Sequence, residues 1–395
     1  MGLLDGVRVL DLSNLLAGPT ISTILGDHGA EVIKVEPPTG DEERNWGKKK
    51  NGIPLWWKVL SRNKRLIAID LNKPEGQEIV KKMVLNTDIL IENFRPGRME
   101  KWGLGWEQLH SLNPRLIMVR VTGFGQKGPY SQFAGFGTLA ESMSGFAHVT
   151  GQPDGPPTLP AFGLADGIAG ITGAFAAVAA LFRREKTGIG EMIDVALYEP
   201  LMFIVGPHII QYDQLGIIQQ REGNQSSRVC PRNTYLTSDN KWIALSASTE
   251  STARRVFQAI GHPELIEDPR FKDNAARLAH RDLVDQIIGD WVRKHTQKEA
   301  IDILRSAGAA VAPIYDARDI YEDPHFRERG SIVTVEDPDF GTVTMQGTFP
   351  KILLNPAKIK FTGRARIGAD TESIMLEMGY TLEQIDELRK KGVIV

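Results

Sequence analysis

The chain has 395 residues, of which 42% are hydrophobic and 24% are charged, a composition typical of a folded globular protein. Because 47 Lys and Arg residues are balanced by 49 Asp and Glu residues, the overall charge excludes a protein that coats nucleic acid. The single cysteine, Cys230, excludes an intrachain disulfide. The N-terminal residues lack the basic stretch followed by an apolar run that is typical of a signal peptide, so a cytoplasmic location is expected.

The first half of the chain alternates between short apolar runs and helical patterns. The apolar runs predict strands, and glycines and prolines mark where the elements end. Strands separated by helices need crossover connections, which predict a mostly parallel sheet with helices on both faces. The predicted strands are 7–12, 31–36, 65–71, 88–94 and 116–124, and the predicted helices are 19–28 and 74–85.

The pattern changes after about residue 220, where a compact α+β segment indicates a second domain. A hairpin with its turn at Asp239-Asn240 opens this segment, and a later hairpin turns near Pro338-Asp339. The predicted elements are a hairpin at 228–246, helices at 252–260, 281–294 and 298–307, a second hairpin from about 330, and helices at 369–378 and 382–391.

A glycine-rich segment follows the last predicted strand of the first half. Residues 123–128 match G-x-G-x-x-G, but a dinucleotide-binding loop must open a helix whose N-terminus binds the pyrophosphate. Helical periodicity begins only at about Thr138, so we interpret the segment as a loop and expect no NAD. The sequence contains no P-loop and no G-x-S-x-G pattern, and its 8 histidines are too scattered to predict a metal site.

Residues 44–69 contain no acidic residue but many Lys and Arg residues, with Trp46, Trp56 and Trp57 between them. Such a segment is suited to hold phosphates and stack an adenine ring, or to bind a nucleic acid strand. A solvated basic face with tryptophans packed underneath has the same composition. The sequence leaves both interpretations open.

Asp166 is the most informative carboxylate. It precedes an apolar run, rich in small residues, that ends before Arg183; this run is short for a membrane span and predicts a buried helix. Aspartate is a favoured N-cap, so Asp166 is predicted to cap this helix. A carboxylate there also gains from the helix dipole and free N–H groups, which keep it ionised as a nucleophile requires. Both roles remain open from the residues alone.

Several motifs occur in one order along nearly the whole chain. They are GVRVLD at 6–11, AGP at 17–19, GAEVIKVE at 29–36, NKR at 63–65, DILIENFRPG at 88–97, GFGQ at 123–126, GPY at 128–130, KTGIGE at 186–191, and the closing residues 379–380 and 392–394. With these motifs the chain resembles the family III CoA-transferases, the group that contains formyl-CoA:oxalate and carnitine CoA-transferases.

The resemblance implies an α/β fold with a Rossmann-like large domain built from both chain ends. That domain would comprise residues 1–215 and 330–395, and a smaller α+β domain with its linkers would comprise 216–329. The resemblance also implies that two chains interlock as an obligatory homodimer.

The same resemblance implies the site residues. Asp166 matches the nucleophilic aspartate of the family, and the substrate is an acyl-CoA with a carboxylic acid acceptor. No metal, nucleic acid or membrane partner is expected. The residues implied to bind coenzyme A are Ile69, Asp70, Asn72, Lys73, Asn93, Phe94, Arg95, Lys101 and Phe136.

The implied reaction moves CoA from an acyl-CoA donor to a free acid through an acyl-aspartyl anhydride and an aspartyl-CoA thioester. One alternative is a 2-methylacyl-CoA racemase, which needs two bases; racemases carry a histidine at the position of Phe136, and phenylalanine accepts no proton. The other alternative is a non-catalytic CoA-binding protein.

Two departures from the family pattern bear on the substrate. Phe136-Gly137 stands where Tyr-Asp or Tyr-Glu is usual, and the sequence contains no tetraglycine run of the kind that forms a lid in formyl-CoA transferase. Both argue against oxalate. Apolar residues at Phe133, Phe136 and Phe162 favour a bulkier acyl group.

Overall fold

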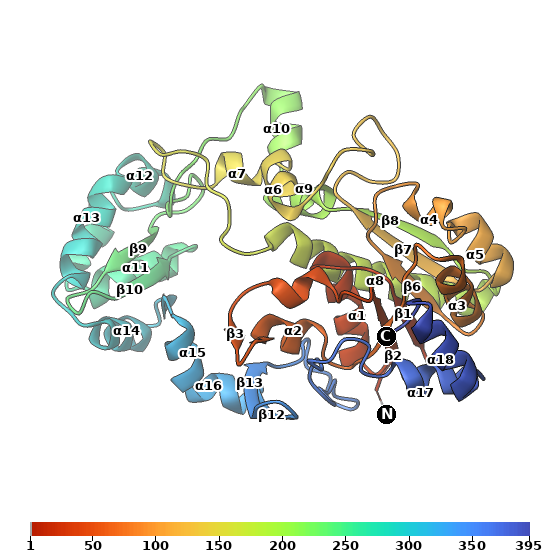
Figure 1. The fold of residues 1–395 in the computed structure, drawn as a ribbon. Helices are drawn as coiled ribbons and strands as arrows, with labels where there is room; N and C mark the ends of the chain where they lie inside the picture. The colour runs from red at the N-terminus through yellow and green to blue at the C-terminus, as the bar shows by residue number, and fades with distance from the viewer. Residues whose placement is uncertain (1) are drawn as a thin grey trace. The chain divides into compact units, whose positions relative to one another are not determined.

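The computed structural model describes residues 2–395, which divide into two compact units. Unit 1 comprises the chain up to Phe146 together with Leu159–Pro207 and Pro324–Val395, and unit 2 comprises Ala147–Thr158 and His208–Asp323 (Figure 1). The boundaries therefore differ from those expected at 215 and 329, and the short segment Ala147–Thr158 joins the second unit.

Unit 1 contains a six-stranded sheet in which every neighbouring pair is parallel. The strands β1, β2 and β5 follow one another toward one edge of the sheet, and β6, β7 and β8 follow one another toward the opposite edge. The direction in which the chain adds strands therefore reverses between β1 and β6, which lie side by side. Loops at the carboxyl ends of strands diverge at such a switch point and leave a crevice there. Across the sheet the strands are β5 (Lys64–Ala68), β2 (Glu31–Glu36), β1 (Arg8–Asp11), β6 (Ile89–Glu92), β7 (Ile117–Thr122) and β8 (Met192–Ala196).

The parallel sheet predicted from the first half is confirmed, with strands close to the expected ranges. The edge strand β8 was not predicted. Its sequence MIDVA is short and carries Asp194, and its first three residues are partly exposed, so it lacks the apolar run of a central strand.

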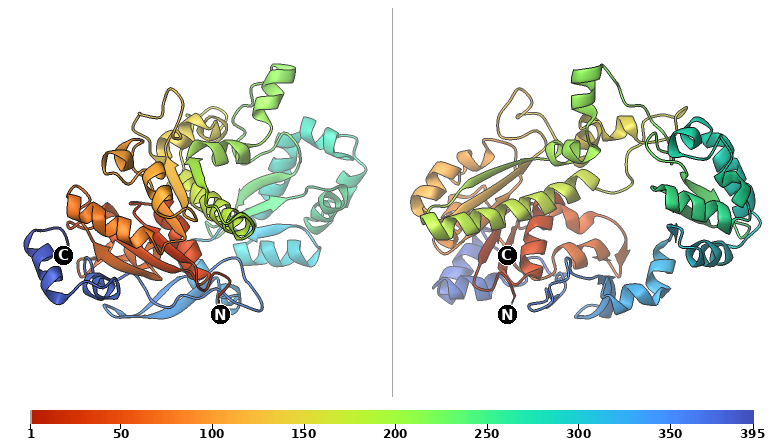
Figure 2. Two further views of the ribbon diagram at one scale, coloured as in Figure 1. Left: turned by 90° about the vertical axis from the view of Figure 1, so that its right-hand side faces the viewer. Right: turned by 180° about the vertical axis from the view of Figure 1, so that it is seen from behind.

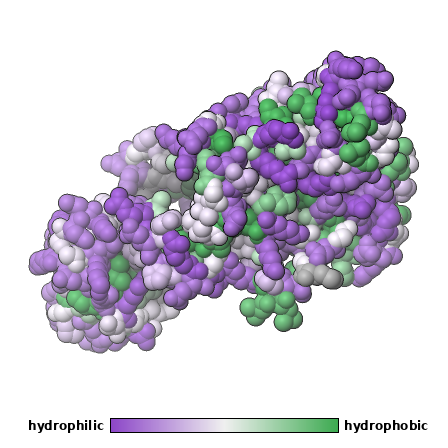
Figure 3. Space-filling model, turned by 60° about the horizontal axis from the view of Figure 1, so that its bottom comes forward, coloured by the Kyte–Doolittle hydropathy of each residue, from purple (hydrophilic) through white to green (hydrophobic). Residues whose placement is uncertain are grey.

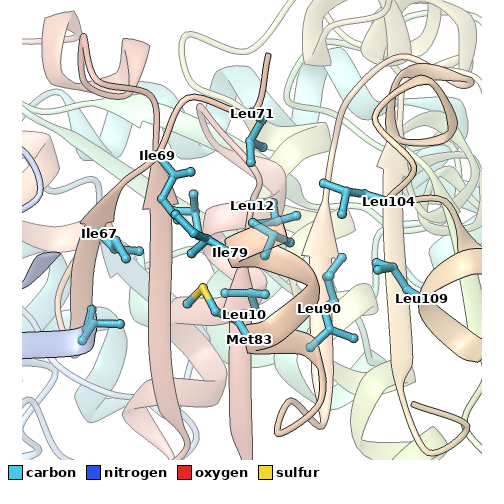
Figure 4. Close-up of a cluster of buried hydrophobic side chains, with 14 of the residues drawn as sticks. Leu10, Leu12, Ile67, Ile69, Leu71, Ile79, Met83, Leu90, Leu104 and Leu109 are labelled. Atoms are coloured by element: carbon cyan, nitrogen blue, oxygen red, sulfur yellow. The ribbon is translucent and has the colours of Figure 1, made fainter. Parts of the chain in front are cut away.

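Helices cover both faces of the sheet, and alternate strand residues point to opposite faces. Leu10, Ile67 and Leu90 pack with Ile79 and Met83 of α3 in one buried cluster (Figure 4). Val9, Ile89 and Ile91, which are neighbours of Leu10 and Leu90 along the strands, belong to a second cluster formed with α1 (Ala17–Asp27) and α8 (Leu164–Thr187). Helix α8 is the long helix that runs along the sheet in the right-hand view of Figure 2. The helices are α1 (Ala17–Asp27), α3 (Pro74–Val84), α5 (Trp106–Leu112), α8 (Leu164–Thr187), α17 (Thr371–Glu377) and α18 (Leu382–Lys390).

The C-terminal part of the chain completes unit 1. Ile374 and Met375 of α17 and Ile385 of α18 belong to the same buried cluster as α3. Ile69 pairs with Ile394 through an isolated bridge, and the Asp70 N–H donates to the Val393 carbonyl oxygen at 2.8 Å. Residues from both chain ends thus form one core.

Unit 2 has an antiparallel three-stranded sheet covered by helices, and its core includes Cys230. Burial raises the pKa of the Cys230 thiol to about 12, which keeps it protonated and unreactive. The principal elements are β9 (Arg232–Leu236), β10 (Trp242–Ser246), α11 (Glu250–Ala259), α13 (Arg281–Val292), α14 (Gln297–Ser306) and β11 (Val311–Pro313).

The remaining elements are short. They are η1 (Glu42–Asn45), β3 (Lys49–Lys50), β4 (Ile53–Pro54), α2 (Leu55–Leu60), α4 (Arg98–Lys101), α6 (Gly137–Met143), α7 (Phe146–Val149), α9 (Tyr198–Val205), α10 (His208–Leu215), η2 (Pro263–Ile266), α12 (Asn274–Ala279), α15 (Ala317–Glu322), α16 (Pro324–Glu328), β12 (Ile332–Asp337) and β13 (Gly341–Gln346).

The basic segment 44–69 has a buried part and an exposed part, and the exposed part holds Lys48, Lys49 and Lys50 with Trp46 and Trp56. Its buried cations are paired within unit 1: Arg44 with Glu36 at 2.7 Å, Lys58 with Asp337 at 2.8 Å and Lys64 with Asp11 at 3.3 Å. The Arg44 guanidinium also lies 3.8 Å from the centre of the Trp57 ring. The three buried cations are therefore engaged by acidic residues of unit 1 and are not free to bind a phosphate.

Helix α8 is buried on one side only, so the prediction of a buried helix holds for half of its surface. Within residues 2–395 it is the one helix long and apolar enough to cross a membrane, a test that the core helix of a globular protein also passes. Phe175 is 73% exposed and Phe182 is 67% exposed. Figure 3 shows one face of the molecule, on which exposed apolar residues (green) lie among polar residues (purple).

Candidate active site

Asp166 lies in the first turn of α8 as its third residue. The N-cap position is occupied by Gly163, and no N-cap side chain binds the first turn, so the prediction that Asp166 caps the helix is wrong. Its carboxylate is near the positive end of the helix dipole, which favours the ionised form. Asp166 is therefore an acid in the first turn whose side chain is not used as the cap.

Burial, and after it the nearby Glu141 carboxylate, together raise the pKa of the Asp166 carboxyl from 3.8 to about 6. A hydrogen bond from the backbone N–H of Asp166 itself lowers the pKa but does not offset these two effects. Asp166 is ionised at neutral pH but is more basic than an ordinary aspartate, which suits a nucleophile.

Gly137, the first residue of α6, touches the Asp166 carboxylate. A Cβ built at position 137 would overlap Asp166 Oδ2, so any side chain there would displace the carboxylate. Phe136 precedes it and is 59% exposed. The Phe136-Gly137 pair thus has a structural reason, because a glycine is what lets α6 approach the start of α8.

A pocket of about 170 Å³ lies at the switch point of the sheet. Three loops surround it: the loop after β1, the loop after β6, and the glycine-rich loop after β7 that leads to α6. Its lining includes Asn14, Leu15, Leu16, Ala17, Asn93, Phe94, Arg95, Pro96, Gly123, Ser131, Phe133, Gly135, Phe136, Asp166 and Leu197. The candidate nucleophile therefore faces the crevice where open α/β sheets bind ligands.

The first two loops are tied together across the switch point. Asn93 Oδ1 accepts from the Asn14 N–H at 2.9 Å, and Asn93 Nδ2 donates to the Asn14 carbonyl oxygen at 2.7 Å. Leu15, the next residue, has a φ of 63°, a strained conformation for a leucine. Its N–H donates to Asp41 Oδ1 at 3.3 Å, which helps to hold the loop in place.

The glycine-rich loop is closed at its base by two glycines. A Cβ at Gly123 would lie 2.5 Å from the Cα of Gly135, so the two ends of the loop touch through their backbones. This close approach explains why residues 123–135 form a loop rather than opening a helix, as the sequence predicted. It also brings Gly123 and Gly135 together in the pocket wall.

The structure brings together some of the residues implied to bind CoA and separates others. Asn93, Phe94, Arg95 and Phe136 line the pocket with Asp166. Lys101 lies on α4, exposed and outside the pocket lining, although Phe94 packs against the adjacent Trp102 at 5.0 Å between ring centres.

The predicted contacts from Ile69 to Lys73 lie apart from this pocket. Ile69 is 1% exposed, and the Lys73 ammonium donates to the carbonyl oxygens of Lys391 at 2.5 Å and Gly392 at 3.0 Å. Asp70 Oδ1 accepts from the Asn72 N–H at 3.0 Å, and Asn72 in turn accepts from Arg98 at 3.0 Å. These side chains are engaged by neighbouring residues in this structure.

Glu141 is a functional candidate that the sequence analysis missed. It is 2% exposed on α6, and its Oε1 accepts from the Ala165 N–H at 3.2 Å. It stands one helical turn after Gly137, so its spacing from the departure at Phe136-Gly137 was the available signal. No histidine lines the pocket within the described chain, and residues 2–395 contain no group of three His, Cys, Asp or Glu side chains arranged to hold a metal ion.

The family comparison decides what this arrangement is. The model of CoA-transferase family III matches residues 4–371. The chain belongs to CoA-transferase family III. It is 43% identical over 394 residues to the succinyl-CoA–D-citramalate CoA-transferase of Chloroflexus aurantiacus, covering 99% of this chain and 98% of the relative.

Two other proteins support the same family assignment. The succinate–glutarate CoA-transferase of Agrobacterium fabrum is 33% identical and is matched over 95% of both chains. A crystal structure of a CAIB/BAIF family protein from Brucella suis aligns with a TM-score of 0.86 at 31% identity, covering 95% of this chain and 99% of that one.

The family III transferase is therefore an enzyme that moves CoA between an acyl-CoA and a carboxylic acid. The resemblance drawn from the sequence motifs is confirmed, and so is the prediction of an acyl-CoA:carboxylate CoA-transferase. The α/β fold with its parallel sheet agrees with the solved family structure.

Proposed function

We propose that Asp166 is the nucleophile of this transferase and that CoA passes through it by two covalent intermediates. The observation that carries the proposal is its position: an ionisable carboxylate of raised basicity lies in the pocket at the switch point of the sheet. No cation is among the groups that shift the pKa of Asp166, and its own backbone N–H is the one group that lowers it, so the carboxylate is not neutralised by an ion pair.

The steps balance without another reactant. Asp166 attacks the thioester carbonyl carbon, the C–S bond breaks, and an acyl-aspartyl anhydride and CoA thiolate result. The thiolate attacks the aspartyl carbonyl carbon, which releases the donor acid and leaves an aspartyl-CoA thioester. The acceptor carboxylate then attacks the aspartyl-CoA thioester, and the same two steps in reverse release the new acyl-CoA. The free energy of the donor thioester is thereby retained in the product thioester.

Developing oxyanions need N–H donors, and the glycine-rich loop is suited to supply them. In the first turn of α8 the Ala165 N–H is taken by Glu141, and the Gly167 N–H donates to the Gly163 carbonyl oxygen at 3.0 Å. The backbone at Gly123 and Gly135 lines the pocket instead, with no Cβ to keep a ligand away.

For coenzyme A, we place the phosphate-bearing end near Arg95. This residue is exposed at the pocket, where a guanidinium can pair with phosphate oxygens while the reacting thioester reaches Asp166. Phe94, held by Trp102, offers an apolar surface beside it.

For the substrates, we propose succinyl-CoA as the donor and a short dicarboxylic acid as the acceptor. The names of relatives that act on citramalate, malate and glutarate support this class. All are larger than oxalate, in line with the apolar walls formed by Phe133 and Phe136.

The test of this function is CoA exchange. The protein is incubated with succinyl-CoA and, separately, citramalate, malate, glutarate and oxalate, and new acyl-CoA is separated by chromatography. We expect exchange with at least one of the three larger acids and little with oxalate. Absence of exchange with every dicarboxylic acid would contradict the proposed substrate class.

We also propose that the protein is a homodimer that uses α8. Ile171, Phe175, Val178 and Phe182 follow one helical stripe on the exposed side of this helix, and Phe203 on α9 is 85% exposed. Contiguous apolar surface of this kind marks a protein interface. Light scattering is expected to give a dimer, and Phe175→Asp is expected to weaken it; a wild-type monomer with full activity would refute the proposal.

A further inference from the structure

A second buried carboxylate lies against the residue that precedes the nucleophile. Glu141 accepts the Ala165 N–H, and Ala165 is followed directly by Asp166. Because Gly163 has no side chain to cap α8, Glu141 supplies from α6 the acceptor that the helix start lacks. An anionic acceptor is favoured at this end of a helix.

Gly137 and Glu141 occupy one face of α6, since residues four apart lie one above the other. That face is directed at the start of α8: Gly137 touches the Asp166 carboxylate, and Glu141 binds the N–H one residue earlier. Two consecutive residues of α8 are thus contacted by two positions on a single helical face.

The other titratable groups on elements packed against α8 have partners of their own. On these elements, Asp27 of α1 pairs with Arg62, Arg120 of β7 pairs with Glu92 and Glu100, Asp194 of β8 accepts from the Gln126 N–H, and Tyr198 and Glu199 of α9 interact with each other. Glu141 is the neighbouring charge that acts on Asp166 and raises its pKa.

We propose that Glu141 is a positioning residue that both fixes the start of α8 and repels the ionised Asp166, so that covalent capture of the acyl group relieves the repulsion. This inference rests on the proposed role of Asp166. Attack on the thioester converts the Asp166 carboxylate into a neutral anhydride and moves the negative charge to the departing thiolate. Glu141 keeps its hydrogen bond to the Ala165 N–H throughout.

The consequence is that the free energy of the enzyme with ionised Asp166 is raised relative to that of the covalent intermediates. Two like charges in a half-buried site repel more strongly than in water, because the surrounding dielectric is lower. Removing one of them by acylation recovers that free energy, and the more basic carboxylate is also the better nucleophile. Glu141 thereby favours the step without touching the substrate.

The test compares wild type with Glu141→Gln in a single turnover. The amide oxygen of glutamine can still accept the Ala165 N–H, whereas the charge is lost. Protein is mixed with succinyl-CoA without an acceptor and quenched in acid. The aspartyl-CoA adduct is measured by intact mass for reactions run between about pH 4 and about pH 8, a range of about two units on each side of the raised pKa. In Glu141→Gln we expect the acid limb, the part of the pH profile in which the rate falls as the pH is lowered, to move down by roughly one pH unit. We expect the rate at high pH to fall several-fold.

Three control variants separate charge from structure. Glu141→Asp keeps the charge and is expected to keep the acid limb of the wild type. Glu141→Ala loses both the charge and the bond and is expected to share the shifted limb while melting at a lower temperature. Glu107→Gln removes one exposed charge on α5 and is expected to change neither quantity.

The outcomes distinguish this inference from the proposed function. An acid limb that stays in place in a folded Glu141→Gln protein, or that moves equally in Glu141→Asp, overturns the role of Glu141. Failure of the wild type to form any adduct, or adduct formation by Asp166→Asn at the wild-type rate, overturns the role of Asp166 instead.

Discussion

The contact between Gly137 and Asp166 leads to a sharp prediction for a single methyl group. Replacing Gly137 with alanine introduces a Cβ that overlaps Asp166 Oδ2 in the present geometry. Both groups are held by helices that pack together, so the smaller adjustment is rotation of the Asp166 side chain. We expect the carboxylate to move by about 1 Å, which is enough to cost roughly 100-fold in rate.

That loss corresponds to about 2.7 kcal/mol of activation free energy, and it should appear in kcat because the displaced group reacts rather than binds. The assay is succinyl-CoA exchange at saturating substrate, with circular dichroism to confirm the fold. Gly167→Ala is the matched control: it adds the same methyl group in α8, next to Asp166 in the sequence, where nothing lies within 4 Å of the new Cβ.

Gly167→Ala is expected to keep its activity and to gain up to about 1 kcal/mol of stability, because alanine is the better helix former. If Gly137→Ala turns over at close to the wild-type rate while retaining the native fold, the argument that a glycine is needed beside the nucleophile is refuted.

Three further predictions concern the same pocket. Asp166→Asn is expected to abolish the aspartyl-CoA adduct seen by mass spectrometry, and an active Asn variant would exclude Asp166 as the nucleophile. The variant is also expected to melt at a higher temperature than wild type at pH 8. The reason is that it removes a carboxylate whose folded-state pKa is raised and whose ionisation therefore opposes folding above that pKa. In the wild type, kcat/KM for acyl-CoA is expected to fall tenfold per pH unit below about 6 as Asp166 is protonated, and a profile flat to pH 4.5 would contradict the pKa of about 6. Arg95→Ala is expected to raise the KM for acyl-CoA by roughly 10- to 100-fold with a smaller effect on kcat, since a charge-assisted bond to a phosphate contributes about 1.5–3 kcal/mol; an unchanged KM would mean that the phosphates lie elsewhere.

Local pattern alone was enough for much of the large unit. The apolar runs that became β1, β2, β6 and β7 are four to six residues long and buried on both faces, so their composition identifies them without reference to partners. The switch from strand–helix alternation to a compact α+β segment was also visible, because it is a change in periodicity along the chain. Ordered motifs then identified the family and singled out Asp166.

Local pattern was insufficient wherever the deciding contact joins residues far apart in the sequence. The sequence could not separate the buried cations of 44–69 from its exposed lysines, because the acidic partners of the buried ones, such as Asp337 for Lys58, lie elsewhere in the chain. β8 is an edge strand whose identity comes from pairing with β7 rather than from its own composition.

The site shows the same division between sequence and tertiary structure. The sequence marked Asp166 and the departure at Phe136-Gly137 as separate features, and the fold relates them, because α6 brings Gly137 against the carboxylate. For Glu141 the sequence offered only its spacing of four residues from Gly137, because a glutamate in a short helix is ordinary until packing places its oxygen on the Ala165 N–H. The periodicity of a segment indicates which of its faces packs against the core. The electrostatics of a site depend instead on side chains that only the assembled helices and sheet bring together.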